Sequence, residues 1–260
     1  MIKQPTNGNF WLCHLTAVVL AIFGLATGAH ADTTLTTWDI TAAAYAVAND
    51  GAVSNYSSAF TAGQIYSGTN LYPYNNTHSG TLPANTWGRT YINSPHPIPT
   101  NSALALSSGN DFLFTNVVAA GYDVKVDGVS NLYIGKVAIS AQNAGLFYST
   151  DSGTSWTQAG GSASLPLLRQ VVDYSAEVNA FLNSNPADLD NTAGSSPLTV
   201  DWALAFWGGS TGSIGIGTDA NGGGNILLTL NGDVTAAPEP STLALFAVGA
   251  GALLQFRRRK

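Results

Sequence analysis

The stretch DFLFTNVVAAGYDVKVDG, residues 111–128, contains two strand-like runs separated by small residues. In its second half the apolar Val124 and Val126 alternate with the polar Lys125 and Asp127. Alternation with a period of two is typical of a strand that buries one side and exposes the other. The stretch therefore predicts two consecutive β-strands, and similar patterns extend along the chain on its C-terminal side.

Several further runs of this kind follow, with turn residues between them. They are NLYIGKVAIS (131–140), GLFYSTDSGTSWTQ (145–158), LTVDWALAFW (198–207), SIGIGT (213–218) and NILLTLNGDV (225–234). The segment before Asn110 is less regular, and TTWDITAAAYAVA (36–48) fits either a strand or a helix. About ten short strands of this kind are typical of a β-sandwich or a jelly roll.

One segment, SLPLLRQVVDYSAEVNAFLNSNP at residues 164–186, has apolar residues at helical spacing. These residues are Leu167, Leu168, Val171, Val178, Phe181 and Leu182. Ser164 is a suitable N-cap and Pro166 suits a first helical turn. The sequence thus predicts a mainly β fold, a β-sandwich or jelly-roll-like domain with one packed helix at about residues 164–184.

The N-terminus has the features of a secretory signal peptide. Lys3 supplies a positive charge, and the apolar run LTAVVLAIFGLATG follows at residues 15–28. The small residues Ala29 and Ala31 then stand before Asp32, which is the usual cleavage pattern. A run of 14 apolar residues is shorter than the ~20 that span a bilayer. We therefore expect cleavage after Ala31 rather than a permanent anchor.

The C-terminus combines a proline box, an apolar run and a basic cluster, in that order. The box is Pro238, Glu239, Pro240, Ser241 and Thr242, the apolar run is Leu243–Leu254, and the cluster is Arg257, Arg258, Arg259 and Lys260. Basic residues favour the cytoplasmic side of a membrane. A helix from Ser241 to Phe256 would be about 24 Å long, against a hydrocarbon core of about 30 Å. Such a segment suits transient membrane insertion better than permanent anchoring.

This tail, residues 236–260, resembles the PEP-CTERM sorting signal of Gram-negative bacteria, with all three parts in the same order. The resemblance implies that the export machinery carries the protein out and that exosortase, a membrane protease or transpeptidase, processes it at the box. It also implies transient insertion in the inner membrane and a species that makes an extracellular polysaccharide matrix. We thus expect a signal peptide (1–31), a secreted β-rich domain (32–235) and a sorting signal (236–260), and a location at the cell surface or outside the cell.

The body between the two signals is acidic and sparsely charged. Residues 32–237 contain 14 acidic and four basic residues, a net charge of −10, and no cysteine. An acidic chain repels phosphate backbones, so nucleic acid is not expected as a partner. Uncharged Ser, Thr, Asn and Gly supply most of the polar surface, which suits a setting rich in polysaccharide. The missing cysteines mean that the exported body must be stabilised by burial alone.

The most distinctive internal stretch is STDSGTSW, residues 149–156. It resembles the Asp-box, with Ser149, Asp151, Gly153 and Trp156 in the defining places and Ser155 where threonine is usual. The resemblance implies a structural hairpin turn rather than a catalytic one. The Asp151 side chain can accept backbone N–H groups across such a turn, while glycine allows a positive φ.

We expect no catalytic residues and no enzymatic activity. GGSTG, residues 208–212, matches the pattern of a nucleophile elbow around Ser210, but the following SIGIGTDANGGG does not predict a helix. His78 and His96 are the only histidines of the body. Both lie in loop-like segments without a nearby partner for zinc binding or base catalysis.

We also expect no metal site, and calcium is the one cofactor that the sequence leaves open. Acidic turn-like stretches occur in DVKVDG (123–128), NPADLDN (185–191) and GTDANGGGN (217–225). The last contains Asp219, Asn221 and Gly222 but lacks the bidentate glutamate that closes a calcium loop.

The leading hypothesis is an exported structural protein of the cell surface or extracellular matrix. A carbohydrate-binding module is the first alternative, and it requires exposed aromatic side chains across one sheet face; we expect Trp38, Trp87, Trp202 and Trp207 to be core instead. A secreted polysaccharide hydrolase is the second alternative. It requires two carboxyl groups about 5 to 9.5 Å apart in a cleft.

Overall fold

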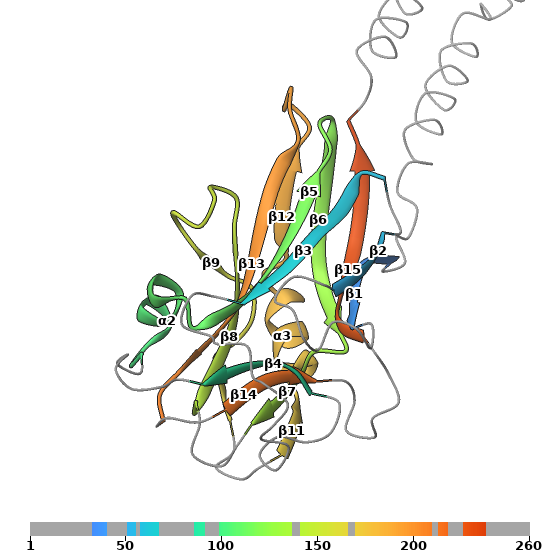
Figure 1. Cartoon of the computed structure of the whole chain (residues 1–260). Coiled ribbons are helices and arrows are strands. Elements are labelled where there is room, and N and C mark those ends of the chain that lie inside the picture. Colours follow the sequence, from blue (N-terminus) through green and yellow to red (C-terminus); the bar gives the residue numbers. More distant parts are fainter. Residues whose placement is uncertain are drawn as a thin grey trace, which may run out of the picture. The chain divides into compact units, whose positions relative to one another are not determined.

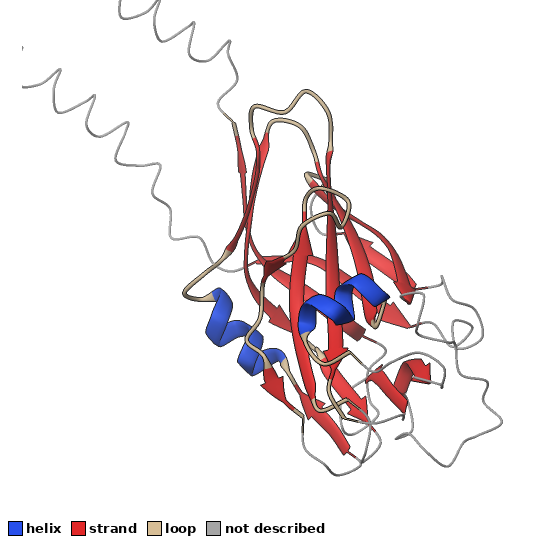
Figure 2. Ribbon diagram, turned by 90° about the vertical axis from the view of Figure 1, so that its left-hand side faces the viewer, coloured by secondary structure: helices blue, strands red, loops and turns tan. Residues whose placement is uncertain are grey.

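The computed structural model describes residues 33–40, 51–55, 58–67, 86–91, 99–136, 141–165, 170–209, 213–217 and 226–237. This part of the chain is mainly β, with antiparallel pairing throughout (Figures 1 and 2), as the alternating sequence patterns predict. The signal peptide with Ala29 and Ala31, the sorting box, the basic cluster, His78, His96, Ser210 and the 217–225 stretch lie outside or largely outside the described residues.

The strands form three sheets. Sheet A has the order β12 (Ala187–Asn191), β6 (Tyr122–Ser130), β15 (Ile226–Ala236), β1 (Thr33–Ile40) and β2 (Gly51–Asn55). Sheet B has the order β10 (Ala163–Ser164), β8 (Asn143–Ser149), β13 (Leu198–Trp207), β5 (Asp111–Val118) and β3 (Phe60–Ser67), with β9 (Thr157–Gln158) also beside β8. Sheet C has the order β11 (Gln170–Asp173), β7 (Tyr133–Lys136), β14 (Ser213–Gly217) and β4 (Thr86–Tyr91).

Sheet C repeats the strand order of sheet A. Strand β6 is followed after two residues by β7, β14 precedes β15, and β11 precedes β12 with a helix between them. The neighbours in sheet C, β11-β7-β14, therefore correspond one to one to the neighbours β12-β6-β15 in sheet A. Asn131, between β6 and β7, has a φ of 62°, a left-handed conformation that asparagine tolerates better than most residues. This residue lies at the boundary between sheet A and sheet C.

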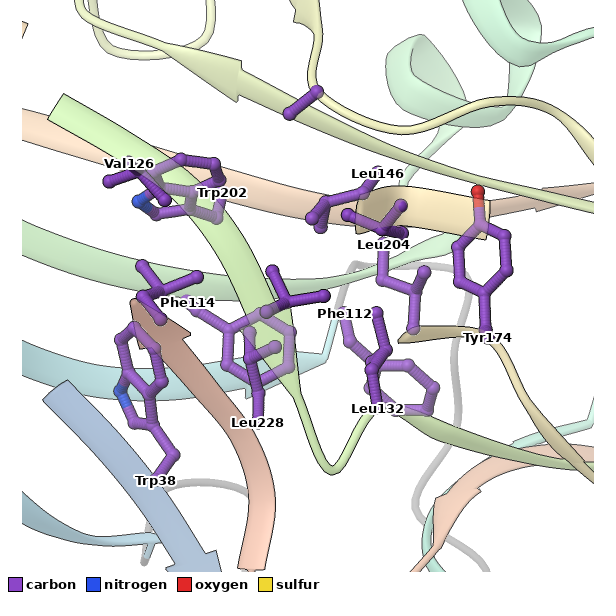
Figure 3. Close-up of a cluster of buried hydrophobic side chains, with 14 of the residues drawn as sticks. Trp38, Phe112, Phe114, Val126, Leu132, Leu146, Tyr174, Trp202, Leu204 and Leu228 are labelled. Carbon is purple, nitrogen blue, oxygen red and sulfur yellow. The ribbon is translucent and has the colours of Figure 1, made fainter. Parts of the chain in front are cut away.

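The inner sides of all three sheets contribute to one hydrophobic core. On β5, Phe112 and Phe114 are buried, and on β13 Trp202, Leu204 and Phe206 are buried with the same two-residue period. Trp38 of sheet A packs edge-on against Phe114 of sheet B, with ring centroids 5.3 Å apart (Figure 3). The core therefore joins sheet A to sheet B in a sandwich-like arrangement.

Two helices are described, α2 (Ser102–Ser108) and α3 (Ser175–Leu182). The prediction of a single helix over about 164–184 was therefore wrong in its first half. Ser164, the expected N-cap, lies in β10 and pairs with Asn143 of β8. Val171 lies in β11 and pairs with Gly135 of β7. The β-branched Val171 and Val172 complete the edge of sheet C, and this pairing overrides the helical spacing. Leu167 and Leu168 lie outside the described residues.

Helix α3 connects β11 of sheet C to β12 of sheet A, and its side chains bond the end of β6 and the residues that follow it. The amide of Asn179 accepts a hydrogen bond from the Val129 N–H (2.7 Å) and donates one to the Val129 carbonyl (2.9 Å). Leu132 N–H donates to the Ser175 hydroxyl (3.0 Å), and Tyr174 N–H donates to the Leu132 carbonyl (2.8 Å). Strand β12 pairs with residues 122–126 of β6 and does not reach Val129. The Asn179 side chain takes the place of a neighbouring strand there, because it bonds both the N–H and the carbonyl of Val129.

We predict that Asn179→Leu lowers the free energy of unfolding by about 1 to 3 kcal/mol, because both polar groups of Val129 would lose a partner in a partly buried setting. Urea unfolding of the exported protein measures this. Asn183→Ala, at an exposed position just after the same helix, should change the stability by only a few tenths of a kcal/mol. Equal effects of the two substitutions would contradict the role of Asn179.

Candidate functional site

The Asp-box-like turn joins β8 to β9, which pair through Phe147–Gln158 and Tyr148–Thr157. The Asp151 carboxylate accepts hydrogen bonds from the Ser155 N–H (2.9 Å), the Ser155 hydroxyl (2.6 Å) and the Ser149 hydroxyl (2.7 Å). Ser149 is buried, and its oxygen in turn accepts the Gly153 N–H (2.9 Å). These bonds to the ionised form lower the pKa of Asp151 to about 2.

Backbone conformation in this turn depends on residues 152 and 153. Ser152 and Gly153 both have positive φ, 58° and 77°. A Cβ atom on residue 153 would lie 3.4 Å from the ring of Trp156, so the indole is folded back onto the glycine. The turn is therefore a closed, self-bonded structure that presents Trp156 to the outer side of sheet B.

That outer side carries a second, smaller apolar cluster, here called the outer cluster. It consists of Ala105, Phe147, Ala205 and Trp207, with Leu106 and Trp156 packed against it. Helix α2 contributes Ala105 and Leu106; its N-cap is Asn101, whose side chain accepts the Leu104 N–H (2.9 Å). Sheet B is consequently apolar on both sides, with α2 and the Asp-box turn packed against the outer one.

Tryptophan placement decides whether sheet B offers an aromatic platform. Trp38 and Trp202 are fully buried in the main core, and Trp207 is buried in the outer cluster. Trp156 is half-buried. The side chain of Trp87 lies outside the described part of the chain. Among the residues whose burial is described, Leu104 is the one large hydrophobic side chain that is exposed, at 49 %.

Acidic side chains gather on the solvent-facing side of sheet A. Strand pairing places Asp188 and Asp233 on either side of Lys125, and Asp190 opposite Asp123. NPADLDN, which the sequence suggested was an acidic turn, lies largely in β12, and DVKVDG lies in the neighbouring β6, where its alternation predicted a strand. Val124, Val126, Ala187 and Leu189 are buried in these strands, which leaves the aspartates between them on the outside.

The carboxyl group of Asp123 lies among other acidic side chains on this surface. Desolvation raises the pKa of Asp123 most strongly, and a hydrogen bond to Asp188 and the negative charges of Asp188 and Asp190 raise it further. Lys125 acts in the opposite direction. Within the described ranges, no group of three or more His, Cys, Asp or Glu side chains is arranged to hold a metal ion.

Asp111 is the most deeply buried of the carboxyl groups whose burial is described, and the sequence did not single it out. Its side chain is 2 % exposed, and its Oδ1 has no hydrogen-bond partner. Because Phe112 faces the main core, Asp111 points to the outer side of sheet B, where α2 packs. Desolvation raises its pKa to about 7. The sequence signal for α2 was present, since Asn101 and Gly109 flank SALALSS as a helix cap pair.

The described residues reach Ala237, at the start of the sorting tail. Strand β15 runs to Ala236, and the Ala237 N–H donates to the Gly121 carbonyl at 2.7 Å. Residues 236–260 match the family model of the PEP-CTERM protein-sorting motif. The tail is a PEP-CTERM sorting signal. The motif implies an exported protein that exosortase sorts to the cell surface.

The PEP-CTERM match covers the tail and not the body. Searches of curated proteins and of solved structures give no match to the chain. In the part of the chain that the structure describes, neither helix is long and apolar enough to cross a membrane. Any more specific function of the body must therefore be argued from the sites above.

For the Asp-box turn we predict a pH-dependent loss of local order. The pKa of Asp151 is lower in the folded than in the unfolded chain. The ionised carboxylate therefore stabilises the turn fully above about pH 4, and this stabilisation is lost as the pH falls through about 2. Hydrogen exchange of the Ser155 N–H should report this loss in the wild type. Asp151→Asn should exchange faster already at neutral pH and show no step between pH 4 and 2, while Asp173→Asn, at an exposed site on β11, should behave like the wild type.

For Asp111 the expected pH dependence has the opposite sign. Its pKa is raised on folding from 3.8 to about 7, so the unfolding free energy should fall as pH rises through this range, by up to about 4 kcal/mol. Asp111→Asn, which is nearly isosteric and stays neutral, should abolish the slope and be more stable than the wild type at pH 8. Urea unfolding at pH 4 and pH 8 measures both. An Asp111→Asn variant that is no more stable than the wild type at pH 8 would contradict the raised pKa of Asp111. As a control, Glu177→Gln, at an exposed site, should leave the pH dependence of the unfolding free energy unchanged.

Proposed function

We propose that the body of this PEP-CTERM protein, residues 32–235, is a non-enzymatic structural component of the cell surface or extracellular matrix, associated with exopolysaccharide. The observation that carries the proposal is the sorting motif at residues 236–260, which follows directly on the last strand of the fold. Proteins with such tails are characteristic of Gram-negative bacteria that make a polysaccharide matrix, as the resemblance implies. We place this protein in that biofilm setting.

The tail has three roles in this proposal. The apolar run Leu243–Leu254 inserts transiently in the inner membrane, and the basic cluster at residues 257–260 holds its end on the cytoplasmic side. Exosortase then acts at the Pro238–Thr242 box, on the outer side of the membrane. The short apolar run favours release over permanent anchoring, since it falls below the thickness of the hydrocarbon core.

Support for a structural rather than an enzymatic body comes from how its chemically capable side chains are used. Trp202 and Trp207 are packed in the two apolar clusters, and the Asp151 carboxylate is bonded within its own turn. Asp123 and Asp188 lie on the outer side of sheet A, where Asp188 pairs opposite Lys125. An uncharged, hydroxyl-rich surface with an acidic sheet face fits a protein that is hydrated within a polysaccharide network.

We predict that a chain ending at Ala237 is exported but is no longer sorted. Ending at Ala237 keeps the β15 pairing intact, including the bond to Gly121, so the body should fold as before. Cell fractionation should then find the protein in a different compartment from the full chain. Unchanged surface display would contradict sorting by the tail. Arg257→Ala or Lys260→Ala alone, each leaving three basic residues, should change the location less.

The structural role has its own test. Cells without the protein should form a matrix that sediments or disperses more easily, and the full chain should restore it. The body should release no reducing sugar from the matrix polysaccharide, and Asp123→Asn with Asp188→Asn should still restore the matrix. Sugar release abolished by these substitutions would favour the hydrolase, and tight retention on the purified polysaccharide would favour the carbohydrate-binding module.

A further inference from the structure

In the part of the chain that the structure describes, the end of β15 pairs with a neighbouring strand on one side. Strand β1 pairs with β15 from Asp39–Ile226 to Thr33–Gly232, and the Thr33 hydroxyl donates to the Gly232 carbonyl (2.8 Å). Beyond Gly232, the pairing described for β15 is with β6 alone, from Asp233–Lys125 to Ala236–Tyr122. Among the described residues, the strand end, residues 233–237, thus pairs with β6 and with Gly121 just before it, while the rest of β15 is central in its sheet.

Gly232 separates this end from the rest of the strand. The β15–β6 register shifts between Asn231 and Gly232, which marks a bulge. A Cβ atom on Gly232 would lie 1.9 Å from the Lys125 carbonyl oxygen. The backbones of β15 and β6 are therefore too close at this point for any residue other than glycine at position 232. The bulge therefore divides β15 into a part up to Gly232, which stays paired, and a strand end that can separate from β6 on its own.

The side chains beyond Val234 contribute little burial to the strand end. Val234 is partly buried and packs against the main core, whereas Thr235 and Ala236 are exposed. Separating residues 235–237 from β6 would break backbone pairing, including the Ala237–Gly121 bond, without removing any buried side chain from the core. Strand ends with few buried contacts open locally at low free-energy cost.

No spacer lies between this strand end and the sorting box, because Pro238 directly follows Ala237. Proteolysis of a folded protein acts on a locally opened backbone, and its rate follows the population of the open form. With β15 fully paired, the box begins one residue from the sheet. Opening of three residues would add about 10 Å of extended chain between the fold and the box.

We propose that the end of β15 acts as a conformational brake on processing, so that exosortase gains access to the box only when residues 235–237 separate from Gly121–Asp123 of the fold. The inference rests on the proposed processing at the box and adds that the body controls its rate. Val234 is the anchor that limits the opening, and the bulge at Gly232 is its end point.

The test inserts Gly-Ser-Gly-Ser between Ala237 and Pro238 in the full chain, expressed in cells that contain exosortase. The insertion supplies about 13 Å of unpaired chain without opening the strand. Pulse-labelling gives the half-life of the precursor, and the mass of the product reports the cleavage site. We expect processing to be roughly tenfold faster, the factor that corresponds to two backbone hydrogen bonds of ordinary net strength. The thermal unfolding of the body should not change.

A matched pair of substitutions at one exposed position checks the direction. Ala236→Gly weakens the strand end and should accelerate processing, whereas Ala236→Val strengthens it through β propensity and should slow processing. Neither changes the sequence of the box. A wild-type precursor that keeps its tail would overturn the processing at the box and the brake with it. If all the chains are processed with equal half-lives, the brake alone is overturned.

Discussion

The antiparallel pairing of β6 with β15 is the interaction on which the rest of this structure depends. It brings residues 122–130 beside residues 226–236 and places β6 and β15 in the middle of sheet A, with β12 and β1 on either side. Because β6 leads into β7 and β14 leads into β15, the same pairing sets up sheet C. A shift of the β6–β15 pairing register by one residue would turn the Val124 and Val126 side chains away from the core and turn the Lys125 side chain towards it. The bulge at Gly232 keeps this register across the close backbone approach.

Strand β13 explains why the body needs two apolar clusters. Its inner side chains, Trp202, Leu204 and Phe206, belong to the main core, and its outer ones, Ala205 and Trp207, belong to the outer cluster. A strand that is apolar on both sides must be covered twice, and α2 and the Asp-box turn supply the second cover. The Asp-box turn is thus a packing element: its carboxylate holds the loop closed, and its tryptophan shields sheet B. A body without cysteine can be stabilised in this way by burial on both sides of a central sheet.

The sequence predicted the mainly β class well because alternation is a local signal, and β6 and β13 show it within a few residues. It failed at residues 170–173, where helical spacing competes with pairing to β7, a partner some 35 residues away in the chain. Asp111 could not be recognised, since an aspartate at a strand start is ordinarily solvated and its burial depends on α2. The role of Asn179 was likewise hidden, because its partner Val129 is 50 residues distant. Contacts of this kind have no signature in a single segment.

The difference between tail and body follows from the same physics. A sorting signal is read in order along the chain, so the box, the apolar run and the basic cluster carry their meaning in 25 consecutive residues. A surface role is instead spread over strands: Asp123, Asp188 and Asp233 become neighbours only when β12, β6 and β15 pair. The two kinds of information overlap at Ala236, which is the last residue of β15 and the first residue of the matched motif.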